Sequence, residues 1–495
     1  MANEAASVRD VELTIRVLED ITALLSLAQS DPMGALRKSD PWLQLPHPSG
    51  NGHLLAGAVS AEALRTLTRR ALDLRDLHGQ VDFGSAQKVL QNEFVQRFII
   101  ENRSPDQKQT ARLLSWAAKK LEQTRSTWSY YIPVRFMFTT EPEQIVLGPV
   151  VLLSRRRALR EVIDGVRGYL KASKTEEDRK WSRRHLLTAL RYYSNFKWVA
   201  KVHVWNCDER TSKDLSFEVL TSALDCLHLL LGRQHSHRMR VGDYDVRMDK
   251  RALGYFDSNN QLHVSTSSGS LDLMGFMEGW SQQLKREDIA EMILLIGLAL
   301  EARADAAARK PLAGRFLEAA RWFGEGVRDK AAFSKVVKFI TAVERLVVAG
   351  KTEDLTQTVS TRVADLTLES DSADTWERRR QDVVKAYALR SDLVHGSVSP
   401  FAERVHYEVS LAGDVAEKTV SSLLFRLGQD GLSATAVSEK EYADWFDRMR
   451  PYVTALHARR NERAAQAQLD VAAIEGSPSR EADINFSTSV QHWPD

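Results

Sequence analysis

Helical periodicity in the last third of the chain is the feature that most constrains the fold. From residue 286 to 460 the apolar residues recur almost throughout with the spacing of amphipathic or buried helices. Before residue 286 the pattern is mixed, because segments rich in β-branched and aromatic residues interrupt the helical ones. We therefore predict an α+β, mainly α fold, with an α+β module at 1–285, an all-α module at 286–460 and a mobile tail at 461–495.

The mixed part divides into shorter segments. Helices are predicted at 8–29, across about 60–125, and at 155–172, 176–196 and 215–232. The Pro-, Gly- and His-rich stretch 30–53 predicts a loop. A hairpin is predicted from 128–138 and 144–153, and further β-prone segments lie at 197–205 and 244–265.

Composition indicates an ordinary soluble protein. The 495 residues are 43% hydrophobic and 27% charged, and the net charge of +2 is too small to indicate nucleic-acid binding by itself. Cys207 and Cys226 are the only cysteines, which suits a reducing cytoplasm and excludes a disulfide framework. The N-terminus has no signal-peptide core, and the longest apolar run, 292–300, is far short of the ~20 residues that span a bilayer. We expect a cytoplasmic protein without a membrane partner.

Arg390 and His395 form the most informative motif. Residues 376–394 contain no Gly or Pro and predict a helix, and Gly396 follows where a C-cap glycine would fall. At about 100° per residue, the apolar residues within roughly 60° of Arg390 are Val383, Ala386, Tyr387, Leu393 and Val394. Burying a charge on such a face is costly unless a partner compensates it.

An arginine and a histidine at a helix end suit a phosphate. The guanidinium group can hold two phosphate oxygens, and an imidazole can take or give a proton near neutral pH. Five helical positions, however, place the side chains of Arg390 and His395 about 140° apart. One small site could include both only if the helix tightens or ends near His395, or if a second copy of the chain supplies the missing group.

A second charge lies on the apolar face of a neighbouring predicted helix, 331–349. The apolar residues that share a face with Glu344 are Phe333, Val337, Ile340, Val347 and Val348. Because its charge is opposite to that of Arg390, we expect the two helices to pack and the charges to meet. The alternative is that Glu344 lies at the edge of a broad apolar stripe and reaches solvent.

These residues resemble a known family. Glu344 in Ala342–Leu346, Arg362 in Ser360–Ala364 and the stretch Tyr387–Ser397 are similar to the Apea-like branch of the HEPN superfamily. The resemblance covers roughly 310–430, and its specific part is the pattern Y-x-x-R-S-x-x-x-H-G. Ser391 replaces the Asn, Asp or His found after the arginine in much of the superfamily, and serine is usual in the Apea-like branch. The resemblance implies that the all-α module is a small HEPN helical bundle that dimerises.

The resemblance also implies an activity. Many members are metal-independent endoribonucleases that act as toxins or antiviral effectors, which would leave 2′,3′-cyclic phosphate and 5′-hydroxyl ends. Arg390 and His395 would be catalytic, Glu344, Ser391 and Asp392 would support them, and neither a metal nor a cofactor is expected. The expected partners are RNA, a second copy in a homodimer or higher even oligomer, and a phage or nucleic-acid trigger recognised by residues 1–285. The alternative is a non-catalytic HEPN scaffold that dimerises or binds RNA.

Three further groups are candidate sites. Arg378, Arg379 and Arg380 lie on the motif helix, where they could guide an RNA backbone. His228, His235 and His237 lie near Cys226, but their spacing fits no strong zinc pattern and arginines surround them, which favours a basic loop. The third group follows the predicted hairpin: arginines at 155–167, then basic residues at 179–185 beside Trp181, Tyr192, Tyr193 and Trp198. This group is either a solvated helix face with core aromatics or a single-stranded RNA surface.

Familiar nucleotide-binding and hydrolase motifs are missing from the sequence. It contains no P-loop, GxGxxG, HExxH or GxSxG pattern. Residues 1–285 therefore carry no recognisable chemistry of their own.

Overall fold

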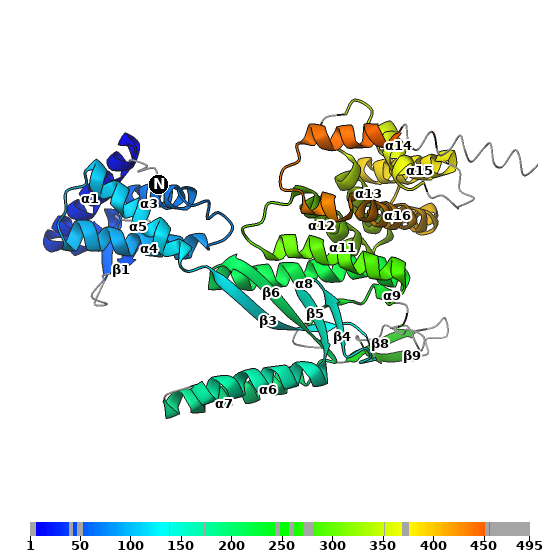
Figure 1. Ribbon diagram of the computed structural model, residues 1–495, viewed down its shortest axis with the longest axis horizontal. Helices are drawn as coiled ribbons and strands as arrows, with labels where there is room; N and C mark the ends of the chain where they lie inside the picture. The colour runs from blue at the N-terminus through cyan, green and yellow to red at the C-terminus, as the bar shows by residue number, and fades with distance from the viewer. Residues whose placement is uncertain are drawn as a thin grey trace, which may run out of the picture.

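The computed structural model confirms an α+β, mainly α fold. It describes residues 6–38, 43–46, 53–137, 139–172, 175–242, 248–256, 262–270, 282, 284–350, 352–368, 376–450 and 455. The predicted tail at 461–495 lies outside these residues. Figure 1 shows a helical unit on the left, a sheet in the lower centre and a helical bundle at the upper right.

A helical unit with its own core begins the chain. Its helices are α1 (Val8–Ser30), α2 (Pro32–Lys38), α3 (Ala58–Asp73), α4 (Phe83–Phe94), a following π-helix (Val95–Ile100) and α5 (Gln107–Glu122). A small antiparallel pair, β1 (Leu43–Pro46) and β2 (His53–Ala56), joins them. The predicted loop at 30–53 is therefore wrong in part, since α2 and β1 lie within it. Leu45 is fully buried in the core of this unit, so a short apolar run was enough to form a strand.

A five-stranded antiparallel sheet follows, in the order β4-β5-β6-β3-β7. Its strands are β3 (Ser126–Arg135), β4 (Gln144–Leu147), β5 (Val150–Ser154), β6 (Trp198–Cys207) and β7 (Arg240–Val241). The predicted hairpin of 128–138 with 144–153 is wrong, because β3 pairs with β6 and β7, whereas 144–154 folds back on itself. Gly148, at φ +53°, supplies the left-handed turn that closes β4 onto β5.

Helices cover both faces of this sheet (Figure 1). On one face lie α6 (Arg155–Ala172) and α7 (Glu176–Tyr193), which connect β5 to β6. On the other lie α8 (Glu209–Leu231) and α11 (Glu287–Ala304), with the short α9 (Arg233–Ser236) after α8. Gly148 and Gly297 allow the β4–β5 turn to pack on α11, since a Cβ atom at Gly148 would stand 2.4 Å from the Gly297 carbonyl oxygen.

The all-α bundle packs on α8 and α11. It consists of α12 (Pro311–Arg328), α13 (Ala332–Val347), α14 (Leu355–Leu366), α15 (Trp376–His395) and α16 (Glu403–Ser433). A single cluster of buried side chains runs from Ile132 in the sheet to Phe446 after the bundle, on both sides of residue 285. The domain boundary at 285 stays a prediction.

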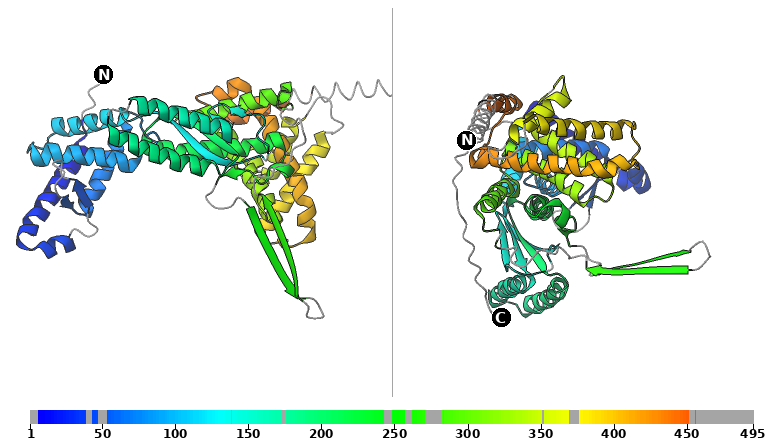
Figure 2. Two further views of the ribbon diagram at one scale, coloured as in Figure 1. Left: turned by 90° about the horizontal axis from the view of Figure 1, so that it is seen from below. Right: turned by 90° about the vertical axis from the view of Figure 1, so that its right-hand side faces the viewer.

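One further hairpin projects from the body of the molecule. Its strands, β8 (Met248–Phe256) and β9 (Leu262–Ser270), pair over their whole length, and both views in Figure 2 show them extending away from the bundle. Among the described helices, none combines the length and the hydropathy needed to span a membrane.

Candidate functional site

Helix α15 keeps its α-helical form up to the histidine of the motif. It ends at His395, and Gly396 adopts φ +77° immediately afterwards. The backbone N–H groups of Ser397 and Val398 then donate to the Asp392 carbonyl oxygen, at 2.9 and 3.3 Å. The helix ends there, as one alternative required, but His395 is still its last helical residue, so ideal helix geometry leaves Arg390 and His395 about 140° apart on its surface. A single chain thus presents the two groups on different faces.

Arg390 meets Glu344 where α15 packs on α13. The guanidinium lies 3.6 Å from the Glu344 carboxylate, with the two side chains 26% and 19% exposed. The Arg390 guanidinium also lies 5.9 Å from the centre of the Tyr387 ring. Its Nε atom is buried without a hydrogen-bond partner among the described residues. The arginine is thus positioned by its neighbours while part of its donor capacity stays unused.

Tyr387, which the sequence indicated only as part of the apolar face and of the motif, completes this cluster. Its hydroxyl donates a 2.7 Å hydrogen bond to Glu344. Burial, together with this carboxylate, raises the pKa of Tyr387 to about 12. The hydroxyl therefore remains a proton donor that holds Glu344 in place. Its position three residues before Arg390, on the same helix face, is the sequence feature that would have identified it.

Asp392 and Arg362 bind groups outside the Arg390 cluster. Asp392 accepts a 2.7 Å hydrogen bond from Arg404, a residue that sequence reasoning missed because it follows the turn into α16. Arg362 donates to the Val347 carbonyl oxygen at 2.7 Å and lies over the Phe446 ring at 4.9 Å. Arg362 thus closes the end of α13 and is not part of the Arg390 cluster. Ser391 is half-buried beside Arg390.

The three consecutive arginines lie at the other end of α15. Arg380 is bound by Glu377 at 2.8 and 3.0 Å and is 3.4 Å from Gln357. At 1.5 Å per residue, Arg380 stands roughly 22 Å along the axis from His395. Arg378 and Arg379 occupy the same first turns of the helix. An RNA strand bound at the motif could therefore contact these arginines only through nucleotides several positions away.

His395 is exposed at the junction between α15 and α16, and apolar side chains surround it in sequence. Phe401, in the connecting turn, is 90% exposed, and Val394 and Tyr407 are also largely open to solvent. The exposed histidine is therefore flanked in the sequence by exposed apolar side chains.

His228 on α8 and the two histidines that follow this helix, His235 and His237, do not form a metal site among the described residues. His228 is fully buried, and both of its ring nitrogens are occupied: Arg328 donates to Nε2 at 3.0 Å, and Nδ1 lies 2.7 Å from the Ser236 hydroxyl. The Ser236 hydroxyl donates to the Gly232 carbonyl oxygen at 2.7 Å, so Nδ1 carries the proton. Burial lowers the pKa of His228 well below 6.5, and the neutral ring acts as a structural spacer.

None of the protein-family models, curated proteins or solved structures compared with this chain matches it. The likeness to the Apea-like branch of the HEPN superfamily thus rests on Glu344, Arg362 and residues 387–397 themselves.

Proposed function

We propose that the protein is a metal-independent HEPN endoribonuclease whose catalytic groups are Arg390 and His395. The observation that carries the proposal is the cluster at the α13–α15 contact. There Glu344 and Tyr387 hold a half-buried arginine, and an exposed histidine ends the same helix. A preorganised guanidinium, combined with an exposed imidazole that a second copy of the chain can supply, is suited to phosphoryl transfer without a metal.

The proposed reaction is an internal transesterification of RNA. The ribose 2′-hydroxyl oxygen attacks the adjacent phosphorus, and the bond from phosphorus to the 5′ oxygen breaks. One imidazole removes the 2′ proton, and one delivers a proton to the leaving 5′ oxygen. Arg390 would stabilise the charge that grows on the phosphate, while Glu344 positions Arg390. The products are a 2′,3′-cyclic phosphate and a 5′-hydroxyl.

A second copy of the chain would complete the site. Because Arg390 and His395 diverge by about 140° on one helix, a two-fold contact near the α15–α16 junction offers a way to bring complementary groups together. The exposed Phe401, Val394 and Tyr407 supply apolar area for such a contact. The active form is then a homodimer or a higher even assembly.

The biological role follows from the resemblance. A HEPN ribonuclease that is free of cofactors must be restrained in the cell, and residues 1–285 are the part available to recognise a trigger. We assign the protein the role of a trigger-activated, toxin-like effector in antiviral defence, acting on RNA in the cytoplasm.

A scaffold without catalysis is the second candidate. The observation in its favour is that Arg390 is already paired with Glu344 and partly enclosed, as a purely structural ion pair would be. In that case the apolar junction at Phe401 would serve only to dimerise the chain.

A cleavage assay separates the two functions. Total RNA would be incubated with the wild-type protein and with His395→Ala, in the presence and absence of lysate from phage-infected cells. We expect the wild type to cut RNA in EDTA, leaving cyclic phosphate ends detectable by mass spectrometry. His395→Ala should be slower by roughly 10²–10⁴-fold, because it removes a proton-transfer group.

The matched control is His237→Ala, which removes an exposed histidine remote from the motif in sequence. It should cut like the wild type. Intact RNA under every condition would favour the scaffold. Activity lost in EDTA and restored by magnesium would contradict the mechanism.

A further inference from the structure

The helical hairpin α6–α7 is the most basic segment of the molecule, and the proposed reaction does not use it. Between residues 155 and 193 there are twelve Lys and Arg and five Asp and Glu, a net charge of +7. The whole chain carries +2, so the remainder carries −5. Three of the five acids, Glu176, Glu177 and Asp178, form the first turn of α7, where the helix dipole favours them.

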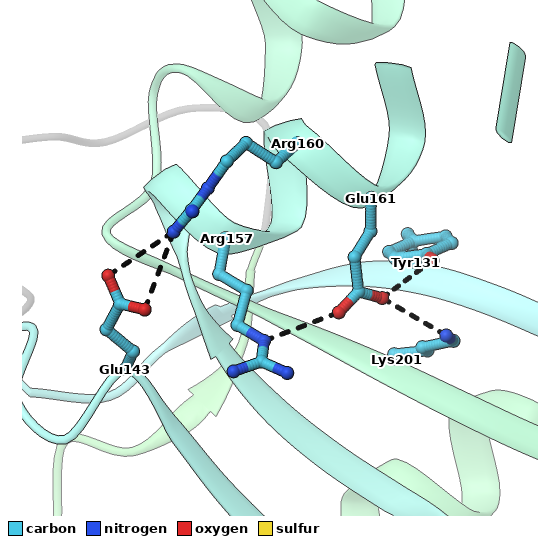
Figure 3. Close-up of polar contacts among 6 residues, drawn as sticks. All are labelled: Tyr131, Glu143, Arg157, Arg160, Glu161 and Lys201. Carbon is cyan, nitrogen blue, oxygen red and sulfur yellow. Dashed lines mark hydrogen bonds and ion pairs between the residues drawn. The ribbon is translucent and has the colours of Figure 1, made fainter. Parts of the chain in front are cut away.

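The root of this hairpin is fixed to the sheet (Figure 3). Glu161 on α6 accepts hydrogen bonds from Lys201 on β6 and Tyr131 on β3, both at 3.1 Å, and Arg157 lies 3.5 Å away. Arg160 reaches Glu143, just before β4, at 3.4 Å. Arg157 and Arg160 thus have carboxylate partners and serve the fold. Figure 1 shows the two helices on the face of the sheet opposite α8.

Three basic residues of α7 are different. The side chains of Lys180, Arg184 and Arg191 are exposed and form no hydrogen bond or ion pair with any described residue. At 100° per residue these three groups lie within about 40° of one another, so they line one face of the helix. Along the axis they cover roughly 16 Å, a length that spans a few nucleotides of an extended strand.

A stacked aromatic pair adjoins this basic face. Trp181 is 63% exposed, and its ring stacks on that of His185 with centroids 3.8 Å apart and planes inclined by 27°. Tyr193 and Trp198, by contrast, belong to the root: the Tyr193 hydroxyl donates to the Tyr131 carbonyl oxygen, and Trp198 is fully buried. Of the tryptophans near this segment, Trp181 is therefore the one available to a ligand.

We propose that the exposed face of α7 binds single-stranded RNA. Lys180, Arg184 and Arg191 neutralise successive phosphates, and an unpaired base stacks on Trp181. Exposed cations attract any polyanion, but an open indole beside them favours bases that are free to stack. The choice of RNA rests on the proposed function, in which this face captures the substrate. The surface itself lies outside the Arg390 cluster, and its binding can be measured without cleavage.

The test is a fluorescence anisotropy titration of a labelled 20-nucleotide RNA of mixed sequence, at several salt concentrations. The full chain would carry His395→Ala, so that cleavage does not interfere. We expect Trp181→Ala to raise the Kd by roughly 5-fold or more, the effect of one lost stacked base, and Trp181→Phe to retain most of the affinity. Arg184→Glu with Arg191→Glu should raise the Kd further. It should also reduce the slope of log binding constant against log salt concentration by about 0.7 for each lost phosphate contact.

Two controls match these changes. Lys108→Glu with Arg112→Glu makes the same change in net charge on the exposed face of α5, and Trp322→Ala removes a partly exposed tryptophan on α12. Both should leave the Kd within twofold of the parent. Circular dichroism and the Tm would show that each variant folds.

Several outcomes would overturn the inference. They are an unchanged Kd in the α7 variants, an equal loss in the α5 variant, and binding to phosphatidylserine vesicles but not to RNA. If the α7 variants lose RNA binding while the wild-type chain cuts no RNA, this surface stands and the ribonuclease proposal fails. If the wild-type chain cuts RNA but the α7 variants bind RNA as tightly as the parent, the ribonuclease proposal stands and the inference about α7 fails.

Discussion

Two of the arginine–carboxylate pairs that join helices in this protein, Arg328–Asp225 and Arg390–Glu344, differ in what surrounds them. Arg328 on α12 binds Asp225 on α8 at 2.6 Å, and Asp225 is completely buried. Arg390 on α15 lies 3.6 Å from Glu344 on α13, and both side chains reach solvent in part. The first pair is enclosed by His228 and by Gly324, where a Cβ atom would stand 2.1 Å from the Asp225 carboxylate. The second lies on a helix that ends in an exposed histidine.

The comparison shows that a pair of an arginine and a carboxylate can have different roles. An enclosed pair mainly resists separation, because removing one partner leaves the other charge without water or a counter-ion. A pair at the protein surface keeps access to a ligand, and its arginine can exchange part of its contact for a phosphate. Three predictions follow the comparison from the stronger pair to the weaker.

The largest effect is expected at Arg328. At pH 8, above the pKa of Asp225, Arg328→Ala should lower the free energy of unfolding by about 3–5 kcal/mol, because it strands the buried Asp225 carboxylate and removes a donor from His228. Arg321→Ala, on the same helix but largely exposed, is the matched control and should change it by less than about 1 kcal/mol. Urea denaturation measures both. A loss below 1 kcal/mol for Arg328→Ala would mean that the enclosed pair is no stronger than a surface one.

The second prediction concerns pH. Burial raises the pKa of Asp225 to about 7 from its ordinary 3.8, despite the opposing effect of Arg328. Between pH 4 and 7 the unfolded chain has lost this proton and the folded chain still holds it, so the carboxyl group lowers the stability of the wild type as the pH rises. Asp225→Asn removes this dependence. The variant's stability relative to wild type should therefore rise from pH 4 to 7, by up to about 4 kcal/mol, and then level off.

His228 has an opposite dependence, since its pKa is lowered and its stabilising contribution is lost as the pH falls below 6.5. His228 is present in the wild type and in Asp225→Asn, so the difference in stability between these two proteins reports on Asp225. Asp214→Asn, on the exposed part of α8, controls for the change of net charge. A flat difference between pH 4 and 7 would show that Arg328 keeps Asp225 ionised.

The smallest stability effect is expected at Glu344. Glu344→Ala should cost about 1–3 kcal/mol, because Arg390 and the Tyr387 hydroxyl lose their shared partner but remain within reach of water. The double variant with Arg390→Ala should lose less than the sum of the two single losses. Glu344→Gln should keep most of the stability yet slow RNA cleavage. Strict additivity in thermal unfolding would mean that the two side chains do not interact.

Much of the motif region was predictable because its determinants are local. The absence of Gly and Pro from 376 to 394 and the glycine at 396 predicted α15, which ends at His395. The apolar stripes of 331–349 and 376–394 each contained one charge of opposite sign, and the structure places Glu344 and Arg390 together. Tyr387 was missed as a participant because an apolar-stripe argument counts a tyrosine as core and ignores its hydroxyl.

The sheet was less predictable because its determinants are not local. The segment 128–138 has the composition of a strand, but composition does not show whether it pairs with the next strand or with β6, some 70 residues away. The turn at Gly148 closes a hairpin inside a segment that reads as one long strand. The Asp225, His228 and Arg328 cluster was missed for a similar reason, since about 100 residues separate Arg328 from the other two.

The sequence by itself determined the class of the fold, the course of the long helices and the candidate pair Arg390 and His395, because helical periodicity and helix termination act within a few residues. Only the tertiary structure decided which strands pair, which carboxylate binds which arginine, and that Trp181 is exposed while Trp198 is buried. Those outcomes depend on hydrogen bonds and packing between segments far apart in the chain, where the same local pattern is compatible with several partners.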